Sequence, residues 1–372
     1  MVDPINTTIC NSALKALLKT GCGVASALAA AFLCCGTAFC ASETDADMKS
    51  NPVLNSPEDI SGELIKAILA NSIQSLTINY EFTACRDEAE NGENSDSTGT
   101  VRQDPNPFRR ANSISPVKSI NFEIRLSPDV HSLACAFDGF EHLEYVNIRD
   151  TSQISNMRAM FRSAKKFNQP IGDWNTSGVS DMTEMFKNAE SFNQPIGGWN
   201  TSGVASMKGM FFMARSFNQP LENWNTSEVT DMSSMFMHAE AFNQPIEKWD
   251  TSKVKNMDSM FWGAESFNQP VGGWNTSNVT SMFGMFCGAR SFNQPVGGWD
   301  TSGVRSMSQM FAYARSFNQP LENWDTSKVE DMVEMFRNAR SFNQPIGRWN
   351  TGAVTSRKDM FEGASSFTFS EP

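Results

Sequence analysis

Two aromatic residue types return at a fixed interval of 25 residues along most of the chain. One series consists of the tryptophans Trp174, Trp199, Trp224, Trp249, Trp274, Trp299, Trp324 and Trp349. A second series, of phenylalanines, runs at the same interval from Phe167 to Phe367. Self-similarity at such a period is typical of solenoids, in which one unit cannot bury its apolar side chains alone but a stack of units can. The spacing therefore predicts a stack of coils and excludes an ordinary single globular core.

Each unit combines a helical pattern with a segment that cannot be helical. The apolar positions of one unit fall within one face of a helix of about three turns, and they are Val179, Met182, Met185, Phe186 and Ala189. Ser177 can cap this helix after a turn at Asn175 and Thr176. The rest of the unit, 191–199, contains Pro195 and glycines and should run extended, with its large apolar residues buried. The sequence thus predicts an α/β repeat solenoid with one short extended arm and one helix per coil.

The repeat is most regular from Asp150 onward and degenerates at both ends. An imperfect unit precedes it, in which Val130, Leu133, Phe137 and Leu143 take the apolar positions, and the last unit turns "FNQP" into "FTFS". Terminal coils must present one face to water, so degenerate ends are typical of capping coils. We therefore assign residues 129–372 to the solenoid with its capping units.

The chain before the repeats divides into two parts. Lys15 and Lys19 precede an uncharged apolar run, 21–39, which ends in small residues and is followed by acidic sequence. This layout is typical of a secretory signal peptide and predicts cleavage after Ala38 or Ala41, within a segment 1–42. An uncleaved membrane anchor and a lipid-modified Cys40 are the alternatives.

Residues 43–128 form an N-terminal segment with one helix and an acidic loop. Ser56 followed by Pro57 predicts the start of the helix. The stretches 75–82 and 119–126 alternate as strands do. The loop, 86–106, is rich in acidic residues, Asn, Ser and Gly, and does not meet the ligand pattern of a calcium-binding loop.

Charge and motif content exclude several classes of protein. The net charge is −11, of which −9 falls between Glu43 and Asp104, so the repeats are nearly neutral and give no basic stripe for nucleic acid. The cysteines lack metal-type spacing, and Cys85 with Cys135 is one pairing that the sequence leaves open. We find no phosphate-binding loop, and no nucleophile pattern beside His131, His142 or His238. We therefore expect no enzyme, cofactor or metal site. The alternative, an enzyme, would have to place its chemistry in residues 43–130.

A comparison of the units gives one candidate site. The residue after the Phe of the helical pattern, at the position that follows Phe186, is charged near both ends of the array and apolar in the middle, where Met213 and Tyr313 extend the apolar run. We expect stacking to align these residues into one exposed stripe that binds a protein partner or mediates dimerisation; they are Phe212, Met237, Trp262, Cys287, Ala312, Met213 and Tyr313. The competing interpretation is that they pack between adjacent helices.

The repeat as written in Phe292–Leu321, "FNQPVGGWDTSGVRSMSQMFAYARSFNQPL", resembles the BspA-type leucine-rich-repeat surface-protein family, whose repeat is also known as a surface-lipoprotein-associated domain of unknown function. The resemblance covers about 130–369. It implies a leucine-rich-repeat-like, right-handed superhelix on the cell surface or in secreted form. It also implies adhesion to a protein or extracellular-matrix partner, with membrane attachment through the N-terminus as one route. An intracellular or translocated interaction scaffold is the alternative function.

Overall fold

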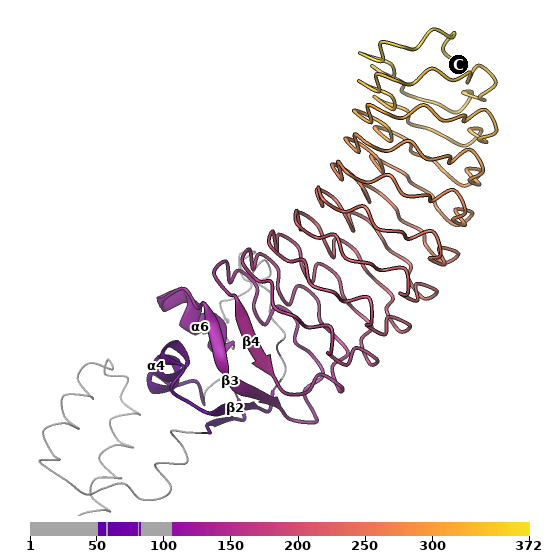
Figure 1. Ribbon diagram of the computed structural model, residues 1–372. Helices are drawn as coiled ribbons and strands as arrows, with labels where there is room; N and C mark the ends of the chain where they lie inside the picture. Colours follow the sequence, from indigo (N-terminus) through magenta and orange to yellow (C-terminus); the bar gives the residue numbers. More distant parts are fainter. Residues whose placement is uncertain (1–50, 57–58, 81, 83–105) are drawn as a thin grey trace, which may run out of the picture.

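The computed structural model describes residues 51–56, 59–80, 82 and 106–372. Within these residues the chain winds into a long, gently curved stack of coils, with the described N-terminal part at one end and the C-terminus at the other (Figure 1). One continuous cluster of buried apolar side chains runs from Leu54 to Met360. The predicted signal or anchor segment, 1–42, and the acidic loop, 86–105, lie outside the described residues. No helix in the described part of the chain has the length and apolar character needed to cross a membrane.

The first coils carry the regular secondary structure. Strands β1 (Val53–Leu54), β2 (Ser75–Ile78), β3 (Ser119–Leu126) and β4 (Tyr145–Ile148) form a parallel sheet in chain order. Helices α4 (Gly62–Ala70) and α6 (Pro107–Ile114) accompany it (Figure 1). Parallel strands in chain order, joined by crossovers, give this part of the chain the same coiled path as the repeats.

The strand predictions for this region hold, whereas the predicted helix start is wrong. The stretch 119–126 is β3, and the stretch 75–82 begins as β2 and ends in an isolated bridge at Phe82. The helix begins after Ser61, whose hydroxyl accepts from the Leu64 amide at 3.1 Å. Ser56 instead lies in a turn in which Asp59 accepts from its amide. The second helix, α6, was not predicted.

The predicted helix in each repeat unit is also wrong, because the unit is a succession of tight turns. The amides of Met182, Glu184 and Phe186 donate to carbonyls of the next coil, while the Met185 amide closes a turn onto Met182. Glu184 adopts a left-handed backbone conformation with φ 57°, which ends any right-handed helix. A second left-handed residue, such as Asn188 with φ 60°, follows four positions later in every coil of the array.

The spacing of the coils explains why turns replace the helix. The rings of Phe186 and Phe211, in neighbouring coils, have centroids 5.8 Å apart. An α-helix with its side chains is about 10–12 Å across, so helices could not stack at that distance. The turns bury positions three and four residues apart, as a helix does. The apolar pattern therefore fits both conformations, and inter-coil hydrogen bonding favours the turns.

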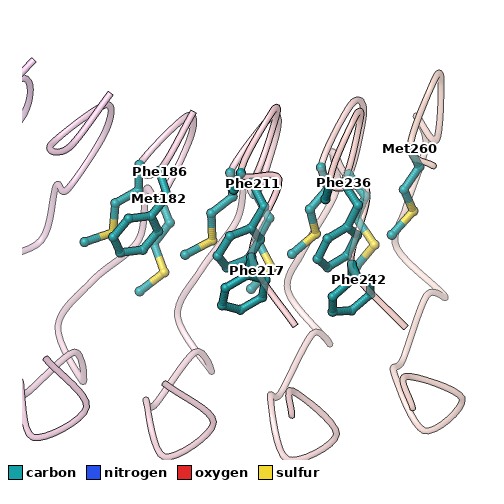
Figure 2. Close-up of a cluster of buried hydrophobic side chains, with 14 of the residues drawn as sticks. Met182, Phe186, Phe211, Phe217, Phe236, Phe242 and Met260 are labelled. Atoms are coloured by element: carbon teal, nitrogen blue, oxygen red, sulfur yellow. The ribbon is translucent and has the colours of Figure 1, made fainter. Parts of the chain in front are cut away.

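Aromatic columns fill the core of the stack (Figure 2). Phe236 lies between Phe211 at 5.5 Å and Phe261 at 5.7 Å, and it stacks on Phe242 within its own coil at 3.9 Å. The predicted burial of the arm residues is confirmed: Phe192 and Ile196 are fully buried, and Trp199 nearly so. From Trp199 to Trp349, the indole N–H of each repeat tryptophan donates to a carbonyl of the preceding coil, as Trp199 does to Ile171 at 3.0 Å.

Side chains, rather than a β ladder, join the extended arms of neighbouring coils. The Asn168 carboxamide oxygen accepts from the Asn193 amide at 2.9 Å and from the Gln194 side chain at 3.0 Å. The same pair of bonds recurs along the array, up to Asn343 on Asn318. Pro195 has no amide to donate, so the asparagine column takes over the pairing at this edge. The predicted cap at Ser177 is wrong because no helix follows it. The Asn175 carboxamide oxygen instead accepts from the Ser177 amide at 3.0 Å, which closes the turn before the apolar segment.

Candidate functional site

The tight-turn segments place the side chains of successive coils in columns on the surface. One of these columns follows the buried Phe at the position of Phe186 in each unit. In the middle coils this column is partly exposed at Phe212, Met237 and Trp262. Two other residues of the same column are inaccessible to solvent: Cys287 is 5% exposed, and Ala312 is fully buried. The residues of the predicted stripe therefore lie in one row across successive coils, but only part of that row is accessible to solvent.

Neighbouring columns add exposed apolar groups to the accessible part. Tyr313 is 41% exposed and Met213 is half-buried, as the stripe hypothesis requires. Phe283 is 37% exposed and was missed, because sequence comparison followed a single column. An aromatic residue where the other units carry polar residues, apart from Val333, was the signal that could have found it. We define the apolar patch as Phe212, Met213, Met237, Trp262, Phe283 and Tyr313.

Glycines in adjacent coils make room for the largest side chains of this surface. A Cβ on Gly284 would lie 2.5 Å from Cε3 of Trp262, so the indole rests on the glycine backbone of the next coil. The ring of Phe283 is tilted against the same indole, with centroids 5.9 Å apart. His238 lies in the same way over Gly263, where a Cβ would come within 2.3 Å of the imidazole Nδ1. The two pairs fix the positions of Trp262 and His238.

Several exposed side chains occupy backbone positions that favour glycine or asparagine. Met213, His238 and Tyr313 have φ values of 56°, 57° and 59°. In other coils the equivalent column holds glycine or asparagine, for example Gly288 and Asn338. A left-handed conformation costs a residue with a Cβ about 1–2 kcal/mol. Met213, His238 and Tyr313 therefore place larger side chains on the surface at positions where glycine would avoid this cost.

A partly buried charge network borders the patch on its N-terminal side. Arg162 donates to Asp138 at 2.9 and 2.7 Å through two guanidinium nitrogens, and to Glu184 at 3.2 Å. Burial acts to raise the pKa of Glu184, but the hydrogen bond from Lys187 and the charges of Lys187 and Arg162 outweigh it and lower the pKa. The Lys187 ammonium also lies 5.3 Å from the ring centroid of Phe212, which joins the network to the patch.

A second charge network borders the patch on its C-terminal side. Arg337 pairs with Glu334 of its own coil and with Glu362 of the next at 2.9 Å. A hydrogen bond from Gln309, followed by the Arg337 guanidinium, lowers the pKa of Glu334. The middle coils therefore present apolar and small residues between two sets of paired charges.

Cys287 and Cys135 differ in oxidation state. Burial, with a smaller contribution from the negative charge of Glu334, raises the pKa of the Cys287 thiol to about 12. This thiol is free and stays protonated at neutral pH, so it acts as a small apolar group within the surface column. Cys135 is disulfide-bonded, and because Cys287 is free its partner lies outside the described residues.

The surface has the chemistry of an interaction site. Within the described ranges, no group of three or more His, Cys, Asp or Glu side chains is arranged to hold a metal ion. The groups that this surface offers to a ligand are aromatic rings, thioethers and one imidazole. Such groups gain free energy by leaving water against another apolar surface.

The fold and the surface together define a repeat solenoid with an apolar patch across its middle coils. The family model described as "Mycoplasma protein of unknown function, DUF285" matches residues 131–227, 219–313 and 271–370, and the chain belongs to this family. No curated protein and no solved structure matches the chain.

Proposed function

We propose that the protein is an exported cell-surface or secreted binding protein whose apolar patch contacts a protein partner. The observation that carries the proposal is the gathering of six apolar side chains on the accessible surface of consecutive coils, between two charge networks. Contiguous exposed apolar surface of this kind marks interaction sites in soluble proteins. Aromatic and methionine side chains are also the types enriched in the buried centre of protein interfaces.

The backbone conformation at the patch supports this proposal. Glycine could occupy the positions of Met213 and Tyr313 without strain, as it does at Gly288. Each of the two residues instead keeps an exposed side chain at a cost of about 1–2 kcal/mol. Burial against a partner returns roughly 25 cal/mol per Å² of apolar area, which is enough to offset that cost for a side chain of this size.

The resemblance to BspA-type surface proteins makes the proposal more specific. It suggests a leucine-rich-repeat-like, right-handed solenoid that acts in adhesion. The close 25-residue spacing gives the patch several similar coils in a row. A repetitive or extended partner can contact successive coils at once, which increases avidity without new kinds of contact.

Export is supported by the disulfide at Cys135. Disulfides persist in oxidising compartments and are rare in reducing ones. The uncharged run 21–39 behind Lys15 and Lys19 is the matching targeting signal.

A paired replacement in the patch tests the binding proposal. Phe212→Ser with Trp262→Ser should leave the protein folded, because both side chains are half-exposed, and should abolish capture of extracellular partner proteins from host material. The control is Glu247→Ser with Lys248→Ser, which changes two exposed residues in the loop before Trp249. Capture that is equally strong in the patch variant and the control would contradict the proposal.

The mass of the protein in its native host tests the export proposal. We expect a species outside the cytoplasm that is shorter by about forty residues, the length of the signal segment. Added acyl mass would identify Cys40 as a lipid-bearing residue. A full-length species confined to the cytoplasm would overturn export.

A further inference from the structure

One surface column of the solenoid changes its charge pattern beside the apolar patch. Its residues, 25 apart through the regular units, alternate in sign from Glu141 to Glu240, are negative in two consecutive coils at Glu240 and Glu265, and are then positive in three consecutive coils. In order, the column holds Glu141, Lys165, Glu190, Arg215, Glu240, Glu265, Arg290, Arg315 and Arg340. We call the last three residues the arginine ladder. They lie in successive coils of the array, and all three are exposed.

Side chains of this column reach from one coil to the next where their signs differ. Arg215 pairs with Glu240 at 2.7 Å, and Arg290 pairs with Glu265 at 3.3 Å. Arg315 and Arg340 form no ion pair with any residue in the described part of the chain. The stack keeps the two in register, since the Ser341 amide donates to the Arg315 carbonyl at 3.2 Å.

The coil spacing brings these like charges close together. Neighbouring rings of the Phe column in these coils, Phe292 to Phe317 and Phe317 to Phe342, are 5.9 and 6.0 Å apart. Like charges carried by neighbouring coils repel one another, because the coil spacing is shorter than the screening length of about 8 Å at physiological ionic strength. An anionic partner would turn that repulsion into attraction, and arginine is suited to carboxylates because it can bind them through two parallel hydrogen bonds.

The ladder adjoins the apolar patch. Tyr313, which is 41% exposed, and Arg315 are two positions apart in the same coil. A partner that covers the patch at this end therefore also meets the ladder. A ligand that matches both surfaces needs a row of apolar groups beside a row of acidic groups, which a protein segment can supply. A sulfated polysaccharide has the negative charge but no apolar row.

We propose that the ligand of this surface is an acidic amphipathic helix of a protein partner, lying along the solenoid axis with apolar residues on the patch and carboxylates on the arginine ladder. In a helix, residues four apart rise about 6 Å, which matches the spacing of the coils, whereas alternate residues of a strand are about 6.6–6.8 Å apart. Residues four apart are also rotated by about 40° around the helix axis, so their row is inclined by about 26° to that axis. A helix inclined by this angle to the solenoid axis would keep one such row over the three coils of the ladder. This inference rests on the proposed binding function and specifies the chemistry of its partner.

The test uses a designed helical peptide as the probe. The peptide is alanine-based, about 17 residues long, with leucine at every fourth position and glutamate three positions after each leucine. A matched peptide has glutamine in place of each glutamate. Binding to the full chain is measured by fluorescence anisotropy at two salt concentrations. Heparin and phosphatidylserine vesicles serve as probes for the other anionic ligands.

The protein variants separate the ladder from the rest of the surface. Arg315→Ala with Arg340→Ala should weaken binding of the glutamate peptide about tenfold or more. The melting temperature of this protein variant should be unchanged or higher than that of the wild type. Arg215→Ala, in the same column but paired with Glu240, is the control and should bind as the wild type does. Binding of the glutamate peptide should also fall with salt.

Three results would overturn the inference. The first is no binding of the glutamate peptide, or equal binding of the glutamate and glutamine peptides. The second is an unchanged affinity in the ladder variant. The third is tighter binding of heparin or vesicles that depends on the same arginines. If the two peptides bind equally and both lose affinity in the variant with Phe212→Ser and Trp262→Ser, the apolar patch still binds a partner and the ladder does not.

Discussion

The contact between Trp262 and Gly284 can be tested by adding a single methyl group. Gly284→Ala and Gly209→Ala change the same position of two different coils, with φ values of +57° and +58°. Both variants take on the strain of a left-handed alanine, about 1–2 kcal/mol. Both regain about 0.5–1 kcal/mol because alanine has less freedom than glycine in the unfolded chain. These shared effects amount to a net destabilisation of about 1 kcal/mol.

Only one of the two variants creates a clash. The new Cβ at position 284 would lie 2.5 and 2.6 Å from Cε3 and Cζ3 of the Trp262 indole. At position 209 the nearest atom is Glu184 Cγ at 3.4 Å, close to ordinary contact. Overpacking of this kind costs about 1–3 kcal/mol. We therefore expect Gly284→Ala to lose about 1–3 kcal/mol more unfolding free energy than Gly209→Ala.

Urea unfolding of both variants, in the wild-type and Trp262→Ala backgrounds, measures this difference as a double-mutant cycle. With the indole removed, Gly284→Ala should cost no more than Gly209→Ala. Equal costs in the wild-type background, or an excess cost that persists without Trp262, would refute the placement of the indole over the glycine.

Three further predictions concern the core, the thiol and the buried ion pair. Phe236→Ala should lower the unfolding free energy by about 3–5 kcal/mol. Phe361→Ala should cost about 1–3 kcal/mol less, since Phe361 has two ring partners where Phe236 has four; urea unfolding compares the two, and equal losses would contradict the stacking. The pKa of Cys287 is about 12, three units above the ordinary value of 9.0. At pH 8 its thiolate fraction should therefore be about a thousandfold smaller than that of an ordinary cysteine. Mass spectrometry should then find Cys287 unalkylated by iodoacetamide until the protein is unfolded, and rapid modification of the folded protein would disprove its burial. Arg162→Ala leaves Asp138 buried without its charge partner and should cost about 3–5 kcal/mol, measured by thermal unfolding; a loss under 1 kcal/mol would show that Asp138 finds another partner.

The sequence predicted some residues of the candidate site and not others. Sequence comparison placed Phe212, Met237 and Trp262 on one surface row, because a 25-residue register puts equivalent positions in line. It could not show that Cys287 and Ala312 are covered while Phe283 is exposed. The exposure of a residue depends on whether a side chain from a neighbouring column covers it. Single substitutions between units decide this, as where Gly284 leaves room for the Trp262 indole.

The sequence by itself determined the period, the stacked architecture and the core positions, because only side chains repeated every 25 residues can bury one another along a stack. It also located β3, whose alternation is unambiguous. The conformation of the apolar segment was decided by the tertiary structure alone. Residues three and four apart are buried by a helix and by successive tight turns alike. The choice between them depends on the 5.8 Å spacing of neighbouring coils, which allows the amides of one coil to reach the carbonyls of the next.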